Sequence, residues 1–299
     1  AIAAGGLYQS PIDWVSYNHV KNRLTSLAPY YQFVRSHPGL FNHAEAGELA
    51  VVYNEAYEIS DPEDFTKGYR GIMMLLGDVH RPFDVLFAGH PDKRGGSDPF
   101  ASADLTAYKA IVLPNTRRMT NSQVGILDDY LSNGGTIIGL GKIADLDEDG
   151  NNVSSSRTFD DHFGSNATTI VNSGKAIAFD SNLGNLYHEN AATSNSETNW
   201  EVTAGNLSSL SSYQSTWASA VDGVVARSFT TTLSRLVHIH RYRSSSDGSE
   251  IYHLVNRDIN LSEDVDNQSI NVTSEAVTSV SIPSGFNSAS VKLSWMTIE

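Results

Sequence analysis

The sequence predicts an α/β fold with a doubly wound parallel sheet, followed by an antiparallel β-sandwich. Between residues 48 and 180, short apolar runs alternate with segments of helical periodicity, as in a sheet that helices bury on both faces. After Ala226 only strand-like segments separated by turns remain, which is typical of a sandwich. The sequence ends just after one such segment, which leaves open whether the sandwich is complete.

The first forty residues predict a short strand, a loop and a helix. Residues 2–6 are small and apolar, as in a crowded barrel strand, and residues 7–14 form a loop rich in side chains that contact sugars. Helical spacing over residues 17–37 ends at Pro38 and Gly39. Because the sequence begins without Met and without the layout of a signal peptide, we expect it to come from the interior of a larger protein.

Five apolar runs are predicted to form the parallel sheet: residues 49–53, 83–87, 110–114, 136–140 and 175–179. Helices are predicted over residues 62–79 and 120–132, each with apolar side chains on one face. Asn121 is the expected N-cap of the second helix, which ends at Asn133 and Gly134.

The helix at 62–79 carries more apolar side chains than one sheet can cover. Met73, Met74, Leu75 and Leu76 follow one another and extend beyond a single stripe. We therefore expect this helix, or the adjacent loop from 80 to 100, to contact another subunit or the missing barrel. The alternative is that the whole set is internal core.

The C-terminal part changes in composition to Ser, Thr and Asn. A helix is predicted over residues 207–221, within a segment that otherwise has the composition of a linker. Strands are predicted at residues 236–242, 251–256, 269–273, 277–282 and 290–295.

Composition and charge exclude several classes of protein. Hydrophobic residues make up 40% and charged residues 18% of the 299 residues, which fits a globular protein and excludes general disorder. The net charge of −14 makes nucleic acid an improbable partner, and no apolar run is long enough to span a membrane. The absence of Cys removes disulfides and Cys nucleophiles without fixing the compartment.

Several stretches, in the same order along the chain, resemble one family. Residues 108–115, 119–120 and 127–138 (YKAIVLPN, MT and LDDYLSNGGTII) resemble the glutamine-amidotransferase-like trimerisation domain of beta-galactosidases and related glycoside hydrolases. Residues 147–151 and 159–164 fit the same domain. Residues 33–41 (FVRSHPGLF) resemble the helix that leaves the catalytic barrel, and residues 251–256 resemble the start of a closing β-sandwich. The resemblance covers most of residues 20–185 and, more weakly, 235–295.

This resemblance implies an order of domains. Residues 1–45 would be the last strand and helix of a (β/α)8 barrel, and residues 46–188 a flavodoxin-like, glutamine-amidotransferase-like α/β domain. Residues 189–228 would be a linker with a helix, and residues 229–299 a β-sandwich. In such enzymes two carboxylates at the mouth of the barrel cleave the glycosidic bond. The catalytic residues would then lie upstream of Ala1, with none in this chain.

The resemblance also implies partners and a location. The expected partners are a carbohydrate, the missing N-terminal barrel portion and further copies of the same chain in a homo-oligomer; nucleic acid and membrane are not expected. The expected location is secreted or periplasmic.

Tyr8, Gln9 and Trp14 are the candidate carbohydrate-binding residues. The loop after the last barrel strand opens onto the active-site face, where aromatic rings stack on sugars and amides bind hydroxyl groups. The alternative, of equal weight, is that Trp14 packs under the returning helix.

Asp145, Asp147 and Asp149 are weak candidates for a calcium site, and no other cofactor is expected. With Gly150 they form the first half of the D-x-D-x-D-G pattern, but position twelve is Ser156 where a calcium loop needs a bidentate carboxylate. A plain turn is the favoured interpretation. His238, His240 and His253 could in principle hold a metal, but an exposed polar face of a sandwich explains them better.

Catalysis by the amidotransferase-like domain itself is not expected. That chemistry uses a nucleophile on a sharp strand-to-helix turn, and neither residues 114–116 nor residues 140–142 match G-x-S-x-G. The leading hypothesis is therefore the C-terminal, largely non-catalytic portion of a glycoside hydrolase that acts on a poly- or oligosaccharide. The alternatives are a free-standing carbohydrate-binding or interaction protein and, more distantly, an independent hydrolase.

Overall fold

The computed structural model describes most of the chain between residues 34 and 281. The described residues are 34–40, 43–90, 98–153, 168–179, 183–191, 204–231, 237–244, 248–256, 259–261, 270–272 and 280–281, with residues 32, 92 and 235. Of the predicted elements, the strands at 2–6 and 290–295 and most of the helix at 17–37 lie outside these residues. So do Tyr8, Gln9 and Trp14.

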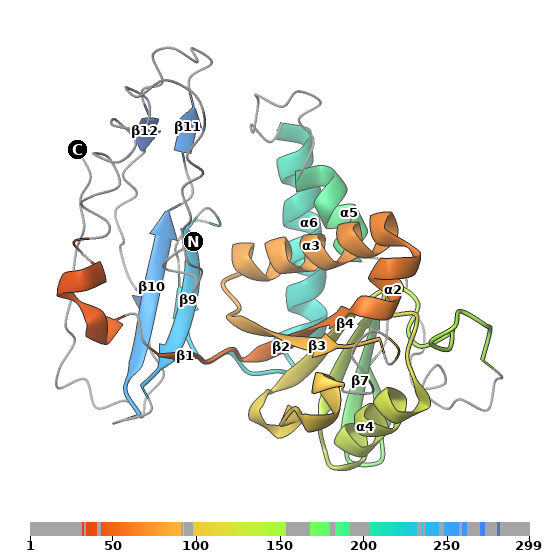
Figure 1. The fold of residues 1–299 in the computed structure, drawn as a ribbon. Coiled ribbons are helices and arrows are strands. Elements are labelled where there is room, and N and C mark those ends of the chain that lie inside the picture. The colour runs from red at the N-terminus through yellow and green to blue at the C-terminus, as the bar shows by residue number, and fades with distance from the viewer. Residues whose placement is uncertain are drawn as a thin grey trace, which may run out of the picture.

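A six-stranded sheet forms the centre of the α/β part, in the order β3-β2-β4-β5-β7-β6 (Figure 1). Five strands are parallel, and β6 at one edge pairs antiparallel with β7. The strands are β2 (Leu49–Asn54), β3 (Phe83–Ala88), β4 (Ala110–Pro114), β5 (Thr136–Leu140), β6 (Thr168–Val171) and β7 (Gly174–Phe179). The doubly wound parallel sheet is thus confirmed, and the antiparallel edge strand β6 is an addition that the sequence did not indicate.

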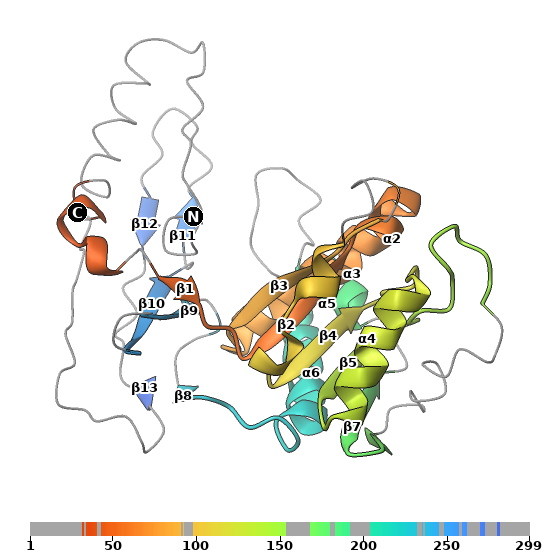
Figure 2. The same ribbon diagram turned by 60° about the horizontal axis from the view of Figure 1, so that its bottom comes forward.

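Helices cover both faces of this sheet, because its central strands are apolar on both sides. One face packs against α3 (Pro62–Asp78), α5 (Leu183–Ala191) and α6 (Ala204–Val221), and the other against α4 (Asn121–Ser132) and the 3-10 turns η3 (Pro99–Ser102) and η4 (Leu105–Ala107). Figure 2 shows the two layers from below. In β2, Leu49 and Val51 point to the first layer while Ala50 and Val52 point to the second, and all four are fully buried.

Three of the four consecutive apolar residues of α3 pack within the chain, while Met73 is half-buried. Leu75 and Leu76 are fully buried, and Met74 packs against the same core, to which α5 and α6 also contribute. That this helix, or the loop from 80 to 100, contacts another subunit or the missing barrel stays a prediction. The sequence of α3 shows how many apolar side chains the helix carries, but it does not show that two later helices, α5 and α6, pack against the same core.

Helices α3 and α5 approach so closely that their backbones touch. A Cβ atom on Gly71 would lie 1.7 Å from the carbonyl oxygen of Gly184, and one on Gly184 would lie 2.2 Å from that of Gly68. Only glycine lacks the Cβ atom, so these positions admit no other residue without moving a helix.

The start of α4 differs from the prediction by one residue. Thr120, not Asn121, is the N-cap: its side chain accepts from the backbone N–H of Gln123, whose side chain in turn accepts from the Thr120 N–H. This is a complete capping box, which requires Gln three residues after the cap. The short helix α2 (Glu55–Ser60) was not predicted.

A smaller antiparallel sheet lies beside the α/β part, in the order β1-β9-β10 (Figure 1). It consists of β1 (Ala44–Glu45), β9 (Val237–Arg243) and β10 (Glu250–Asn256), with Arg243 opposite Glu250 at the hairpin end. Two-stranded pairs join β11 (Ile259–Leu261) to β12 (Ile270–Val272) and β13 (Val280–Ser281) to β8 (Thr230–Thr231). A further 3-10 turn, η2 (Pro38–Leu40), precedes β1. Within the described ranges, no helix is both long and apolar enough to cross a membrane.

Candidate functional site

The strand order predicts where a ligand would bind. Strand β2 is flanked by β3 on one side and β4 on the other, so the chain winds in opposite directions from it. In doubly wound sheets, ligands bind in the crevice that this reversal leaves at the carboxyl ends of the strands. The residues that follow β2 and β4 are therefore the first place to look for a site.

Asn54 closes the end of β2. Its side-chain oxygen accepts a 2.7 Å hydrogen bond from the backbone N–H of Tyr57 and so caps α2, while its Nδ2 donates to the carbonyl oxygen of Arg118 at 2.6 Å. Asn54 is only 1% exposed. Its amide group thus joins the loop after β4 to the loop after β2.

Asn115 follows β4 with a left-handed backbone, φ 44°. A non-glycine residue in this region of backbone conformation is uncommon and marks a strained turn, but an amide side chain is not a nucleophile. Its Nδ2 donates to the Asp64 carboxylate and its Oδ1 accepts from the backbone N–H of Lys142. The left-handed turn at Asn115 was not indicated by the sequence, and the Asn115 side chain is held by hydrogen bonds inside the protein.

Asp64, in the first turn of α3, is the centre of this cluster. It accepts hydrogen bonds from the Tyr57 hydroxyl at 2.7 Å, from Asn185 Nδ2 at 2.7 Å and from Asn115. Burial, followed by the Asp64 carboxylate, raises the pKa of Tyr57. We call Asn54, Tyr57, Asp64, Asn115 and Asn185 the crevice cluster. Its members form hydrogen bonds to one another and to nearby backbone at the carboxyl ends of β2 and β4.

The three acidic candidates after β5 are placed separately. Asp145 forms an ion pair with Arg117, whose Nε lies 2.9 Å from Asp145 Oδ1. Asp147 accepts from the backbone N–H groups of Asp149 and Asn151 at 3.0 and 2.8 Å. The hydrogen bond from the Asn151 side chain, followed by these backbone bonds, lowers its pKa. Across the described part of the chain, no three His, Asp or Glu side chains are arranged to hold a metal.

The three histidines of the small sheet are also used separately. His253 lies directly opposite His240, and His238 pairs with Asp78 of α3 at 3.2 Å. Burial, followed by the neighbouring His238 and His253, lowers the pKa of His240 to about 4. His240 therefore stays neutral at physiological pH.

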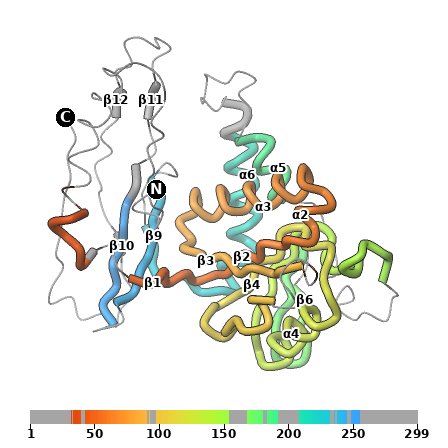
Figure 3. The backbone as a smooth tube through the Cα atoms, viewed as in Figure 1, coloured from red at the N-terminus to blue at the C-terminus, as the bar shows by residue number. Residues whose placement is uncertain are grey.

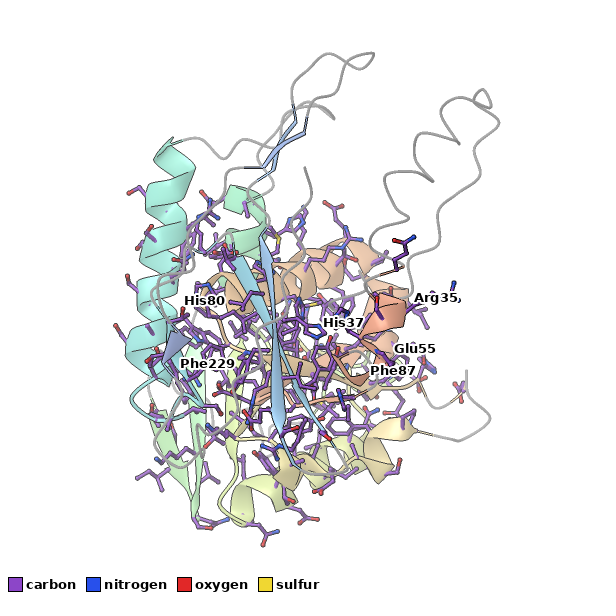
Figure 4. The ribbon with its side chains drawn as sticks, turned by 90° about the vertical axis from the view of Figure 1, so that its left-hand side faces the viewer. Arg35, His37, Glu55, His80, Phe87 and Phe229 are labelled. Carbon is purple, nitrogen blue, oxygen red and sulfur yellow. The ribbon has the colours of Figure 1, made fainter. Side chains whose placement is uncertain are left out.

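Near the crevice cluster, the described residues at the two ends of the loop after β3 are also held by hydrogen bonds. Asp98 accepts from the backbone N–H of Gly89 at 3.1 Å and from Gln123 Nε2 at 2.8 Å, and Glu55 accepts from the His90 N–H at 2.8 Å. Figure 4 labels Glu55 and Phe87, which mark the ends of β2 and β3. The signal that could have located this region is the asparagine that directly follows the apolar runs at 49–53 and 110–114, namely Asn54 and Asn115.

No protein-family model matches the sequence, and no curated protein sequence matches it. Among solved structures, the chain is similar to an exo-carrageenase GH42 from Bacteroides ovatus (14% identity over 89% of this chain and 31% of that chain, TM-score 0.42). It is similar to alpha-L-fucosidase isoenzyme 2 from Paenibacillus thiaminolyticus (13% identity, 75% and 40%, TM-score 0.49). It is also similar to a cold-adapted beta-galactosidase from Rahnella sp. R3 (10% identity, 80% and 39%, TM-score 0.51).

The chain spans less than half the length of each of these three proteins. At 10% identity and a TM-score of 0.51, the Rahnella beta-galactosidase shows the fold and nothing further. The chain is thus similar in structure to a portion of a glycoside hydrolase.

Proposed function

We propose that this chain is the C-terminal, largely non-catalytic portion of a glycoside hydrolase that acts on a poly- or oligosaccharide outside the cytoplasm, secreted or periplasmic. Its role is to act as a scaffold, to provide contacts between subunits and to form one wall of the substrate cleft. The two catalytic carboxylates belong to a barrel that precedes residue 1, of which residues 1–45 are the last strand and helix.

One observation carries this proposal. At the end of the sheet where a doubly wound enzyme binds its substrate, the side chains of the crevice cluster are hydrogen-bonded to one another, and the residue at the strained turn after β4 is Asn115, which is not a nucleophile. Asp64 receives three hydrogen bonds, so both of its carboxylate oxygens are engaged by neighbouring side chains. A sheet whose polar side chains are bonded to one another in this way still provides a rigid body, which is what a scaffold requires.

The fold similarity to the Rahnella beta-galactosidase supports the same proposal. In this proposal residues 46–188 are the glutamine-amidotransferase-like domain and residues 229–299 belong to a β-sandwich. Tyr8, Gln9 and Trp14 line the substrate cleft and contact the sugar.

The test is to assay the purified chain of 299 residues against a panel of aryl glycosides and polysaccharides. We expect no turnover. Turnover that is lost in Asp64→Asn but kept in the matched variant Glu63→Gln, whose side chain is exposed on the same helical turn, would contradict the proposal. Binding of a polysaccharide by the chain alone, measured by affinity electrophoresis, would favour a free-standing carbohydrate-binding protein.

A further inference from the structure

The chain passes twice between the α/β part and the small sheet. Residues 46–48 lead from β1 to β2, and residues 222–229 lead from α6 to β8, ahead of β9. Figure 3 shows both connections, one orange and one cyan. Contacts between these two connecting segments would therefore help to hold the small sheet against the α/β part.

Arg81 lies between the two connections and is completely buried, with none of its side chain exposed. Its Nη1 donates to Glu48 Oε2 at 2.7 Å, on the first connection. Its Nη2 donates to Asp222 Oδ1 at 2.7 Å and to the Val225 carbonyl oxygen at 2.6 Å, on the second. One guanidinium group therefore joins segments that are far apart in the sequence.

A second set of bonds links the same segments. Glu48 Oε1 accepts from the backbone N–H of Ser228 at 2.9 Å. Lys109, at the start of β4, donates from Nζ to Ser228 Oγ at 2.8 Å, and Arg227 donates from Nη1 to the Val79 carbonyl oxygen at 2.7 Å. The two connections are thus bonded to each other, to the sheet and to the end of α3.

Arg81 is held in place by the turn that ends α3. Its backbone N–H donates to the Leu76 carbonyl oxygen at 2.8 Å, and the N–H of His80 donates to that of Gly77 at 3.1 Å, with His80 at φ 55°. This is the Schellman arrangement, in which a left-handed residue turns the chain sharply after a helix. Figure 4 labels His80, near the strands of the small sheet.

Asp78, in the same turn, forms a third connection. Its buried carboxylate accepts from His238 of β9 at 3.2 Å and from Arg235 at 3.2 Å. It also accepts from Tyr187 of α5 at 2.6 Å. His238 lies against Gly77, where a Cβ atom would come within 2.5 Å of the imidazole ring.

We infer that residues 78–81 act as a clasp, which fixes the small sheet to the α/β part so that the two open and unfold as one body. The physical reason is the burial of paired charges. Separating the sheet would leave the buried carboxylate of Asp78 without His238 of β9 and without Arg235, and removing one partner of a buried pair is strongly unfavourable. It would also pull on the two connections, which Arg81 holds through Glu48 and Asp222. This inference does not depend on the proposed function.

The experiment is native-state hydrogen exchange on the full chain, followed by mass spectrometry. The measured quantity is the exchange rate of amides in β9 (Val237–Arg243) divided by that of amides in β4 (Ala110–Pro114). In Arg81→Met we expect this ratio to rise roughly 100-fold, because the small sheet then opens by itself. In Arg243→Met, a matched change on the small sheet where the arginine is half exposed and pairs with Glu250 of its own hairpin, we expect the ratio to stay within about threefold.

An unchanged ratio in Arg81→Met overturns the inference, whether neither rate changes or both rise equally. If Arg81→Met does not fold, Asp222→Asn decides the matter. This variant keeps the shape of a side chain that is 26% exposed and removes its charge from both Arg81 and Arg227. The expected rise in the ratio is then about tenfold, and an unchanged ratio overturns the clasp.

Discussion

The hydroxyl group of Tyr187 donates a 2.6 Å hydrogen bond to the buried carboxylate of Asp78, and so joins the middle of α5 to the end of α3. The same hydroxyl accepts from Gln214 of α6 at 2.8 Å. Burial, followed by the Asp78 carboxylate, raises the pKa of Tyr187, so the hydroxyl stays protonated and remains a donor. The hydroxyl group of Tyr187 in α5 is therefore hydrogen-bonded to both α3 and α6, on the same face of the sheet.

Replacement of Tyr187 by Phe should lower the free energy of unfolding by about 1–3 kcal/mol, because it removes a bond to a buried charge and leaves Gln214 without its acceptor. Urea unfolding followed by circular dichroism measures the change. The neighbouring Tyr213→Phe is the control, with an expected change within about 0.5 kcal/mol. Equal losses in the two variants would show that the bond to Asp78 contributes nothing specific.

Acid should weaken the small sheet through Glu250. Burial by itself would raise the pKa of this carboxyl group, but hydrogen bonds from Arg241, Tyr252 and Arg243 bring it to about 2, below the ordinary value of 4.5. Because the pKa in the folded protein lies below that in the unfolded chain, the contribution of Glu250 is complete above about pH 4.5 and is lost as the pH falls towards 2. In Glu250→Gln, the free energy of unfolding should fall less steeply between pH 5 and pH 2, as measured by urea unfolding at a series of pH values.

The pKa of Glu45 is shifted in the opposite direction to that of Glu250, so its effect on stability should depend on pH with the opposite sign. Burial, followed by repulsion from Asp84, raises the pKa of this carboxyl group above its usual range. Its charged form therefore destabilises the folded protein, and the penalty disappears as the pH falls through the raised pKa. Glu45→Gln should be slightly more stable than the parent protein at pH 7 and indistinguishable from it near pH 3. The reverse pattern would refute the pKa directions given for the two residues.

Two substitutions at Asn115 should separate the cost of backbone strain at this turn from the contribution of the side-chain hydrogen bonds. Both Asn115→Ala and Asn115→Gly remove the bonds to Asp64 and Lys142, but alanine must also adopt φ 44° with a Cβ atom. We expect the alanine variant to be less stable than the glycine variant by about 1 kcal/mol, as measured by the shift in urea midpoint at constant m-value. Equal stabilities would mean that the loop relaxes to an ordinary conformation once the amide is removed.

The glycines at the crossing of α3 and α5 should tolerate nothing larger. Gly71→Ala should cost about 3 kcal/mol or more, since the new Cβ atom would overlap the Gly184 carbonyl oxygen. Gly125→Ala, on the exposed side of α4 where the space around the new atom is open, should instead stabilise the protein by about 0.5–1 kcal/mol. Thermal unfolding of the two variants tests both signs, and a loss in the second would contradict the open space around Gly125.

Local patterns predicted the sheet well, for a clear physical reason. Central strands such as β4 and β5 are buried on both faces, so their sequences are continuous apolar runs that need no context. The edge strand β6 alternates between exposed and half-buried residues and carries no such run. The capping residue was misplaced because Thr120 and Asn121 are both good caps, and the choice depends on Gln123 three residues beyond the first.

The sites formed by long-range contacts could not be predicted in this way. Arg81 and Asp222 are 141 residues apart, and Asp64 and Asn185 are 121 apart. No spacing in the sequence relates such residues, since only the completed fold brings them together. The polar residues Asn54 and Asn115 could have been noticed, because each stands at or next to the end of an apolar run that ends at the switch point of the sheet.

The contact between Gly68, Gly71 and Gly184 also bears on how relatives of this chain can be recognised. A core side chain can be exchanged for another of similar volume, so core positions drift over evolutionary time until little identity remains. A place where two backbones touch has no such substitutes, because any residue other than glycine adds an atom where none fits. A search pattern of G-x-x-G in the helix between the first two parallel strands, with a third glycine at the start of the helix after the last parallel strand, should therefore find distant homologues that overall similarity misses.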